Sequence, residues 1–392
     1  MKSFLLATTM LASVTGYAAA DVALSGDARM GIVSSDNTTT FESRMRIKFT
    51  GSGTTDGGLA FGGSFRAQDA QGAEDGTSGT VYMSGAFGKI AFGDVDSADL
   101  ASTGQLASVG YTGLGSTNEI NYAADGFDAW GLPAKIHAVR TLPDFENTSD
   151  HRYDLTTDVA GGTASKVLYT YSAGNVTLNA SVGQLSNGSA NHDSYAAGVD
   201  YVMGNLTLAA GYGKNELDFE TMGTLSGFET IDSVTLPYST VVDAYSVSAD
   251  VTDMTASATY VMGATTLKGI YQDKRLDASV RYTNNGTYVG TTDESLTAQS
   301  YGLSVQHTME ALTLTAFGVT TRLKDGILSD SDNTVDLNRY GLGASYDLGG
   351  GASFLAGAVR VETPDLNVTG NNVISVGKTS YSAFDVGVNF SF

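Results

Sequence analysis

The sequence contains no cysteine, and this absence removes several classes of protein at once. Disulfides staple small extracellular domains whose hydrophobic cores are insufficient, so a cysteine-free chain of 392 residues is not such a scaffold. Thiolate catalysis and thiolate metal sites are excluded as well. The stability of the fold must therefore come from packing and from backbone hydrogen bonds.

Proline and long apolar runs are also scarce. The chain has only 4 prolines but 48 glycines and 20 tyrosines, a composition that favours many short strands joined by tight turns. No apolar run reaches the roughly 18 residues that a membrane-spanning helix needs. A helical membrane protein is therefore excluded.

The first 20 residues have the pattern of an export signal. A basic start at Lys2 is followed by an apolar run from Phe4 through Val14, and three alanines precede Asp21. No proline-rich, serine-rich or charged linker divides the rest of the chain. We therefore expect residues 1–20 to be a signal peptide and residues 21–392 to be a single domain.

Apolar and polar residues alternate along the remaining chain over about eight to twelve positions at a time, with glycine, asparagine, aspartate and serine between the segments. No window predicts a helix. Alternation with period two places apolar side chains on one face of a strand and polar side chains on the other. Residues 41–49 show it most clearly, because one face carries Phe41, Met45, Ile47 and Phe49 and the other carries Glu42, Arg44, Arg46 and Lys48.

Short turns alternate with long polar connections near residues 94–117, 142–164, 215–243 and 324–338, as in a barrel with one periplasmic and one extracellular rim. Tyrosine before a tight turn is favoured at a membrane boundary. Strands that meet lipid must close without a free edge, so the first and last strands should pair. A soluble sandwich is the alternative. Four turns share the spacing Tyr-x-x-Gly, namely 171–174, 201–204, 260–263 and 346–349.

The inward face of the first three strands is predicted to carry a cationic wall. Lipid exposure of such charges would cost about 2 to 4 kcal/mol each near the midplane, which fixes the register. The following loop is acidic and, if it folds inward, would oppose the wall and create a transverse field. A solvated surface loop is the other interpretation. The cations are Arg29, Arg44, Arg46, Lys48 and Arg66, and the acids are Asp94, Asp96 and Asp99.

Catalysis has little support in the sequence. The four histidines, His137, His151, His192 and His307, have no metal-ligand spacing, and no Gly-x-Ser-x-Gly elbow is present. The acidic net charge of −21 argues against nucleic acid as a partner. The run 330–333 lacks the spacing of an EF-hand loop. We expect no enzyme activity and no cofactor, and we leave only weak calcium binding open.

Four stretches are more specific than composition: 24–31 (LSGDARMG), 84–90 (SGAFGKI), 168–174 (LYTYSAG) and 340–351 (YGLGASYDLGGG). With them the chain from Asp21 to Phe392 resembles the alphaproteobacterial general porins. The resemblance implies an all-β, transmembrane 16-stranded barrel, a homotrimer in outer-membrane lipid, and a third loop folded into the lumen. It further implies passive diffusion of small hydrophilic solutes and ions, with the cationic wall and loop acids at the constriction and Phe392 as assembly signal.

The sequence departs from the family pattern after residue 122. A long segment with Trp130 and the strand-like stretch from Lys135 to Arg140 precedes Lys166. An extra hairpin would give 18 strands, whereas an insertion within the third loop keeps 16 and is preferred. Two functional alternatives stay open, a substrate-specific channel and a secreted soluble β-protein. The acidic chain suggests cation preference, although cations at the constriction could reverse it.

Overall fold

The computed structural model describes residues 21–35, 38–68, 79–125, 139–140, 166–187, 190–231, 234–284, 287–325, 334–362, 366–367, 372–373, 375–376 and 380–392. Several sequence predictions lie outside these residues. They are the signal peptide 1–20, the connection 142–164, Trp130, His137, His151 and the acidic run 330–333.

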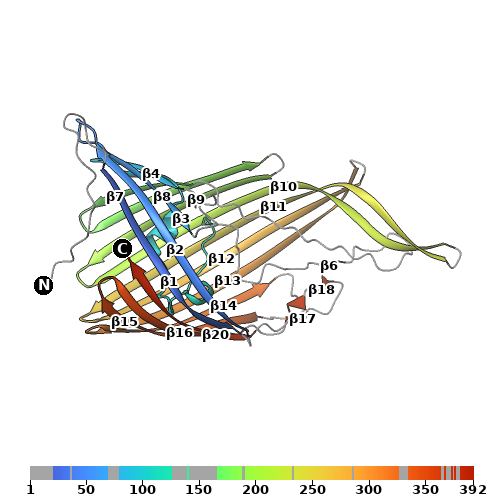
Figure 1. Cartoon of the computed structure of the whole chain (residues 1–392). Coiled ribbons are helices and arrows are strands. Elements are labelled where there is room, and N and C mark those ends of the chain that lie inside the picture. The colour runs from blue at the N-terminus through green and yellow to red at the C-terminus, as the bar shows by residue number, and fades with distance from the viewer. Residues whose placement is uncertain are drawn as a thin grey trace.

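Sixteen of the described strands close into one antiparallel barrel (Figure 1). Strand β1 pairs with β2 and also with β20, so the barrel has no free edge, as hydrocarbon requires. The predicted 16 strands and the predicted pairing of the first and last strands are confirmed. The strands are β1 (Asp21–Ser35), β2 (Thr38–Thr54), β3 (Ala60–Gln68), β4 (Thr80–Gly85), β5 (Gly88–Gly93), β7 (Lys166–Ala173), β8 (Val176–Asn187), β9 (Ala190–Met203), β10 (Leu206–Ile231), β11 (Val234–Met262), β12 (Thr265–Asn284), β13 (Thr287–Met309), β14 (Leu312–Asp325), β15 (Thr334–Gly349), β16 (Ala352–Glu362) and β20 (Tyr381–Ser391).

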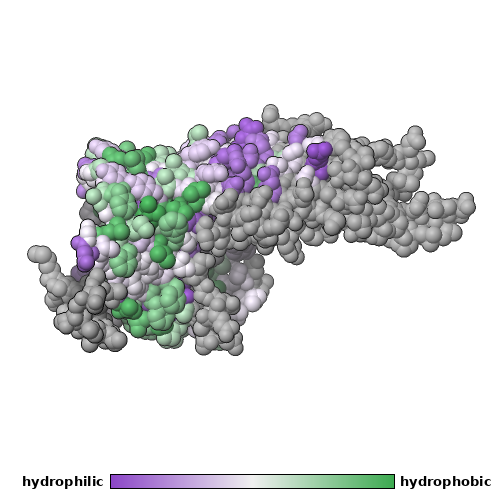
Figure 2. Space-filling view, turned by 90° about the horizontal axis from the view of Figure 1, so that it is seen from above, coloured by the Kyte–Doolittle hydropathy of each residue, from purple (hydrophilic) through white to green (hydrophobic). Residues whose placement is uncertain are grey.

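The outer face of the barrel is apolar, as the alternation predicts. Phe41 is 90% exposed, and Met45 on the same face of β2 is exposed too. Figure 2 shows hydrophobic residues gathered over one end of the molecule and hydrophilic residues toward the other, where the long strands project. Other exposed apolar side chains at alternate positions are Val22, Leu24, Met30, Phe61, Phe65, Leu314, Leu342, Phe354, Phe384 and Phe390.

Tyrosines form two groups on this outer face. Those of the four Tyr-x-x-Gly turns, Tyr171, Tyr201, Tyr260 and Tyr346, are all exposed. The glycine that ends each motif has a positive φ, for example 60° at Gly174, which only glycine adopts without strain. The turns are therefore as predicted. A second group lies further along the strands: Tyr195, Tyr212, Tyr271, Tyr301 and Tyr340. Two aromatic bands of this kind flank the apolar belt of membrane barrels.

The predicted long loop at residues 215–243 is wrong. Strands β10 and β11 continue as one ladder as far as the pair Ile231 and Val234, and their end projects well beyond the barrel (Figure 1). Outside hydrocarbon no face has to be apolar, so the alternation fades there while backbone pairing continues.

The described residues between β5 and Lys166 add no strand to the barrel. Strand β6 (Val139–Arg140) pairs with β18 (Asn372–Val373), and β17 (Leu366–Asn367) pairs with β19 (Ser375–Val376), both apart from the barrel sheet. The preferred alternative, an insertion within the third loop of a 16-stranded barrel, is therefore confirmed, and the alternative of 18 strands is not.

Two short helical turns lie in the connection from β5 to β7, where none was predicted. They are α1 (Ala98–Thr103) and the 3-10 turn η1 (Leu114–Ser116). Helices this short leave almost no periodic signal in a sequence. Among the described residues, no helix is long and apolar enough to cross a membrane.

Candidate functional site

The loop after β5 folds into the barrel as a hairpin, residues 98–125, which we call the third-loop hairpin. Its two legs hold each other through Gln105 and Ile120, which exchange two hydrogen bonds of 2.8 Å between the side-chain amide and the backbone. The Asn118 amide donates to the Leu106 carbonyl at 2.6 Å. The third loop contacts inward-facing side chains of the barrel strands, which confirms the prediction that it enters the lumen.

The α1 end of the hairpin is held on β8. The Ala98 amide donates to Ser181 Oγ at 2.8 Å, and the Asn179 side chain donates to Ser102 Oγ at 2.8 Å. Both Ser181 and Asn179 face inward from β8. The first of these contacts satisfies the Ala98 amide at the start of the helix, where the N-cap residue makes no side-chain cap hydrogen bond.

Two acids are buried between α1 and the inner face of the barrel at β11. Asp99 is 0% exposed and Asp253 of β11 is 1% exposed, and each has one carboxylate oxygen directed at Gly213. Asp253 Oδ2 also accepts hydrogen bonds from Gln272 Nε2 at 2.6 Å and from the Ala123 amide at 3.2 Å. Burial raises the pKa of Asp99 above the ordinary carboxyl value. The two carboxyl groups are therefore best satisfied when they hold a proton between them.

We predict that this contact weakens as pH rises. A carboxyl whose pKa is raised by packing stabilises the packed state fully below its ordinary pKa, and this stabilisation is lost as pH rises through the raised value. Between the ordinary and the raised pKa, each pH unit costs about 1.4 kcal/mol, and above the raised pKa the stability no longer changes. Channel noise and protease cleavage within the hairpin should therefore increase from acidic to alkaline pH. The Asp99→Asn variant loses the titrating group on α1 but keeps the Asp253 carboxyl, so its slope should be smaller than that of the parent; equal slopes in both proteins would contradict the prediction.

Apolar packing holds the middle of the hairpin against the inner face of β12, β14, β16 and β20. Fully burying a side chain of this size stabilises by about 1.5 to 3 kcal/mol, so several together seat the loop firmly. The hairpin contributes Leu106, Val109, Leu114 and Ile120, and these barrel strands contribute Ile270, Phe317, Val319, Val359 and Ala383.

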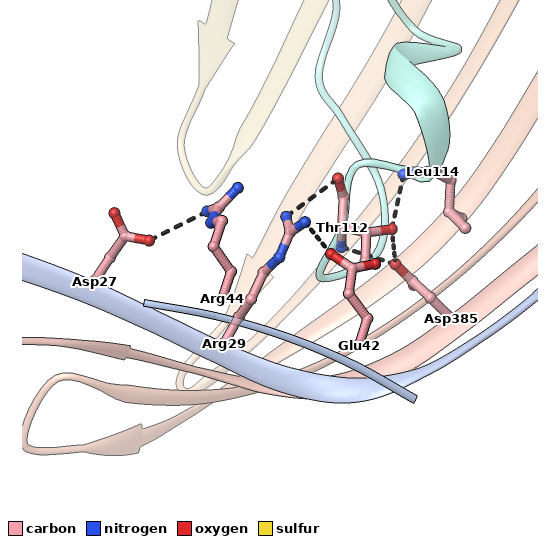
Figure 3. A network of polar contacts seen from close by, with 7 residues as sticks. All are labelled: Asp27, Arg29, Glu42, Arg44, Thr112, Leu114 and Asp385. Atoms are coloured by element: carbon pink, nitrogen blue, oxygen red, sulfur yellow. Dashed lines mark hydrogen bonds and ion pairs between the residues drawn. The ribbon is translucent and has the colours of Figure 1, made fainter. Parts of the chain in front are cut away.

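The tip of the hairpin reaches the seam of the barrel (Figure 3). The Thr112 amide and hydroxyl donate to one carboxylate oxygen of Asp385 in β20, at 2.8 and 2.6 Å. Arg29 of β1 donates to the Thr112 carbonyl at 3.5 Å, and its guanidinium lies 5.9 Å from the centre of the Tyr111 ring. Asp385 is 1% exposed. The hairpin thus crosses the whole lumen, from β8 to the seam.

Apart from Arg29, which contacts the tip of the hairpin, the cationic wall lies on the part of the barrel that the hairpin leaves accessible. Arg44, Arg46 and Arg66 are partly exposed and Lys48 is exposed. Many inward side chains from β8 round to β20 are instead buried, including Asn179, Ser194, Asn215, Gln272, Ser300, Val319, Val359 and Asp385. Among the described residues, the accessible charged side chains thus lie on β1 to β3, and we infer that the passage runs between them and the hairpin.

Two of the five wall cations have acidic partners on the wall itself. Arg29 pairs with Glu42, and Arg44 pairs with Asp27 at 3.1 Å (Figure 3). Lys48 and Arg66 are directly opposite each other in the ladder of β2 and β3. Like charges at this position are unfavourable unless water screens them, so a hydrated lumen is consistent with the arrangement.

The predicted loop acids divide into two kinds. Asp94 and Asp96 are exposed where the loop leaves β5, and among the described residues neither forms an ion pair with the cationic wall. Asp99, contrary to prediction, does not face the lumen, because α1 turns its side chain onto the barrel. Sequence reasoning also missed Arg339, which donates to the Glu119 carbonyl at 2.9 Å.

The last residue lies at the seam. The Phe392 carbonyl accepts from the Gly26 amide at 2.7 Å, and its amide donates to the Gly26 carbonyl at 3.0 Å. Its side chain is exposed on the outer face. Among the described residues, no group of three histidine, aspartate or glutamate side chains is placed to hold a metal ion.

These features together define a class of protein. An apolar belt with aromatic bands surrounds a closed barrel, and a charged lumen is narrowed by an inward-folded loop. Alternation of lipid-facing and lumen-facing residues in this way is the arrangement of an outer-membrane channel.

Comparison with known proteins identifies the family. A sequence model described as Gram-negative porin matches residues 7–366. A porin of Rhodobacter capsulatus is 34% identical over 380 residues, which are 95% of this chain and 100% of that protein. The chain therefore belongs to the Gram-negative porin family. It is an outer-membrane channel and not an enzyme, so the predicted family, location and kind of function are confirmed.

Solved structures agree with the fold. A porin refined at 1.8 Å resolution is 30% identical with a TM-score of 0.59, covering 95% of this chain and 100% of that one. The outer-membrane protein OmpT of Vibrio cholerae, in trimer form, has a TM-score of 0.61 at 15% identity with the same coverage.

Proposed function

We propose that the channel passes small hydrophilic solutes and ions by passive diffusion, without a specific binding site. The observation that carries this proposal is the open passage between the third-loop hairpin and a partly accessible, charged wall. An oriented, charged passage admits solutes that keep their hydration and excludes apolar ones, which would have to displace ordered water. Size exclusion is then set by how far the hairpin stands from the cationic wall.

The cationic wall supports a local preference for anions. Among the described residues, two acids, Asp27 and Glu42, pair with cations of this wall, so these two acids and the five cations together have a formal charge of 5 minus 2, or +3. Asp94 and Asp96 lie at the entry of the loop and oppose this charge only partly. Acids such as Asp250, Asp277 and Asp293 lie on extended parts of β11 to β13, away from the wall. The acidity of the whole chain is therefore a poor guide to selectivity.

The same proposal includes a homotrimer in outer-membrane lipid. It is supported by the trimer form of the Vibrio cholerae protein with this fold. It is further supported by the apolar outer face of the barrel, which can meet either lipid or a neighbouring copy.

Two processing roles complete the proposal. Residues 1–20 direct export and are removed before Asp21, and Phe392 is read during barrel assembly. Amino-terminal sequencing of protein from outer membranes should show that the protein begins at Asp21.

Deletion of Phe392 should lower the amount of folded barrel in the membrane without affecting the folding of protein refolded in detergent.

The test is single-channel recording from the mature chain, refolded in detergent and added to a planar bilayer under a salt gradient. We expect ohmic conductance with weak selectivity and insertion in steps of three. Block by one sugar or ion at low concentration would favour a substrate-specific channel. Protein that is folded and inserted but does not conduct would overturn the proposal.

A further inference from the structure

Glycines on the inner face of the barrel lie beneath the third-loop hairpin along its whole path. Three cross-strand pairs carry most of them: Gly198 with Gly211, Gly343 with Gly357, and Gly31 with Gly387. The first pair lies beneath α1, the second beneath Val109 and Gly110, and the third beneath the ring of Tyr111. Gly302 lies between them, beneath Leu106.

At five of these seven positions the atom nearest to an added Cβ belongs to the hairpin, whereas at Gly31 and Gly387 the backbone of the neighbouring strand is nearer than the Tyr111 ring. A Cβ atom on Gly357 would lie 2.5 Å from the Gly110 Cα, and one on Gly211 would lie 2.7 Å from the Asp99 Cα. Carbon atoms in contact are normally about 3.5 to 4.0 Å apart. Neither glycine has a positive φ, so the strand backbone does not require glycine there. A glycine within a strand otherwise weakens the strand, and close approach of another backbone is the reason that remains.

Glycines elsewhere in the barrel have different surroundings. A Cβ on Gly62 would meet the Tyr82 ring of the neighbouring strand at 2.8 Å, which is a cross-strand aromatic cover within the sheet. Gly51 has nothing within 4 Å, and the nearest atom to a Cβ on Gly269 is 3.9 Å away. Close approach of the hairpin is thus a property of one set of glycines and not of the barrel in general.

We propose that Gly31, Gly198, Gly211, Gly302, Gly343, Gly357 and Gly387 form a seat that fixes where the hairpin crosses the lumen and so sets the cross-section of the channel. The seat rests on the proposed function, because its effect is on diffusion through the passage. Side chains there lift the hairpin off its side of the barrel toward the cationic wall. The glycines are positioning residues, since they act on the passage only through the hairpin.

A size exchange at Gly302 tests the seat. A Cβ there would meet Leu106 Cδ1 at 2.7 Å and Leu106 Cγ at 3.4 Å. The Gly302→Val substitution adds as many carbon atoms as Leu106→Ala removes, so the double variant conserves volume. We expect Gly302→Val alone to lower single-channel conductance by roughly a third, because the hairpin must withdraw to a normal contact distance. The double variant should return to within about a tenth of the parent, a coupling that contact between the two sites requires.

Gly269→Val on the outer face of β12 is the matched control, because it adds the same side chain to a strand with open space beside it, and it should conduct like the parent. Conductance of Gly302→Val equal to the parent, or lowered but not restored by Leu106→Ala, would overturn the seat. If Gly302→Val alone does not fold, a folded double variant with parental conductance supports the seat, and a double variant that also fails to fold overturns it. The recording from the parent protein separates the two proposals, because a parent without diffusive conductance removes the proposed function. If the parent conducts, the conductances of the variants decide the seat. If the parent does not conduct, protease cleavage of the hairpin in parent and variants decides it.

Discussion

Replacing Arg46, Lys48 and Arg66 together by glutamine is expected to lower the local concentration of chloride about tenfold at low salt, and to lower the preference for chloride over potassium by at least that factor. All three lie on the inward face of β2 or β3 and are at least partly exposed, so each charge acts on ions in the passage. A unit charge roughly 8 Å from an ion in water contributes about 0.5 kcal/mol, and three contribute about 1.5 kcal/mol. That energy corresponds to about tenfold in local anion concentration.

Reversal potentials under a salt gradient measure this preference. The dilute side should be about 10 mM, where the screening length is about 30 Å, because physiological salt would mask most of the effect. The control is Arg275→Gln, which removes a cation that pairs with Asp277 on an exposed part of β12. It should leave the reversal potential unchanged. A shift from Arg275→Gln of about a third of that of the triple variant, in proportion to the charge removed, would mean that overall charge, and not the cationic wall, sets selectivity.

The faces of the strands could be predicted from sequence because lipid imposes a period of two on every residue that it touches. A slip of one position in β2 would exchange Phe41 and Met45 for Glu42 and Arg44 on the outer face. The pattern is local, so the chain reveals it without knowledge of any long-range contact. It fails where lipid ends, and for that reason the continuation of β10 beyond residue 215 was missed.

The path of the hairpin could not be predicted in the same way. Its anchors join residues far apart in the chain, and Thr112 and Asp385 are separated by 273 positions. Asp99 illustrates the difficulty, because its charge predicts a place in the lumen while its buried position depends on Asp253 in β11. Asp385 gave one local signal, a carboxylate on the inward face of an apolar final strand. An inward acid with no visible partner in sequence is thus a reason to look for a loop that binds it.

Removing the carboxylate of Asp385 is expected to release the tip of the hairpin. The Asp385→Ala variant loses both hydrogen bonds to Thr112, and bonds to a charged group stabilise by about 1.5 to 3 kcal/mol each. A loss of about 3 kcal/mol raises the population of released tips roughly 100-fold. The residue is buried in the seam but points into the lumen, so the β20 ladder with β1 and β16 remains intact.

Single-channel recording should therefore show a normally inserted barrel with frequent brief changes of conductance. Two milder variants separate the contributions. Asp385→Asn keeps an acceptor oxygen without the charge, and Thr112→Val removes the hydroxyl donor while the backbone amide still reaches Asp385, so both should lie between the parent and Asp385→Ala. A quiet Asp385→Ala trace with parental conductance would show that apolar packing of the hairpin alone holds the tip. The hydrogen bonds from Thr112 would then only compensate the burial of the Asp385 carboxylate.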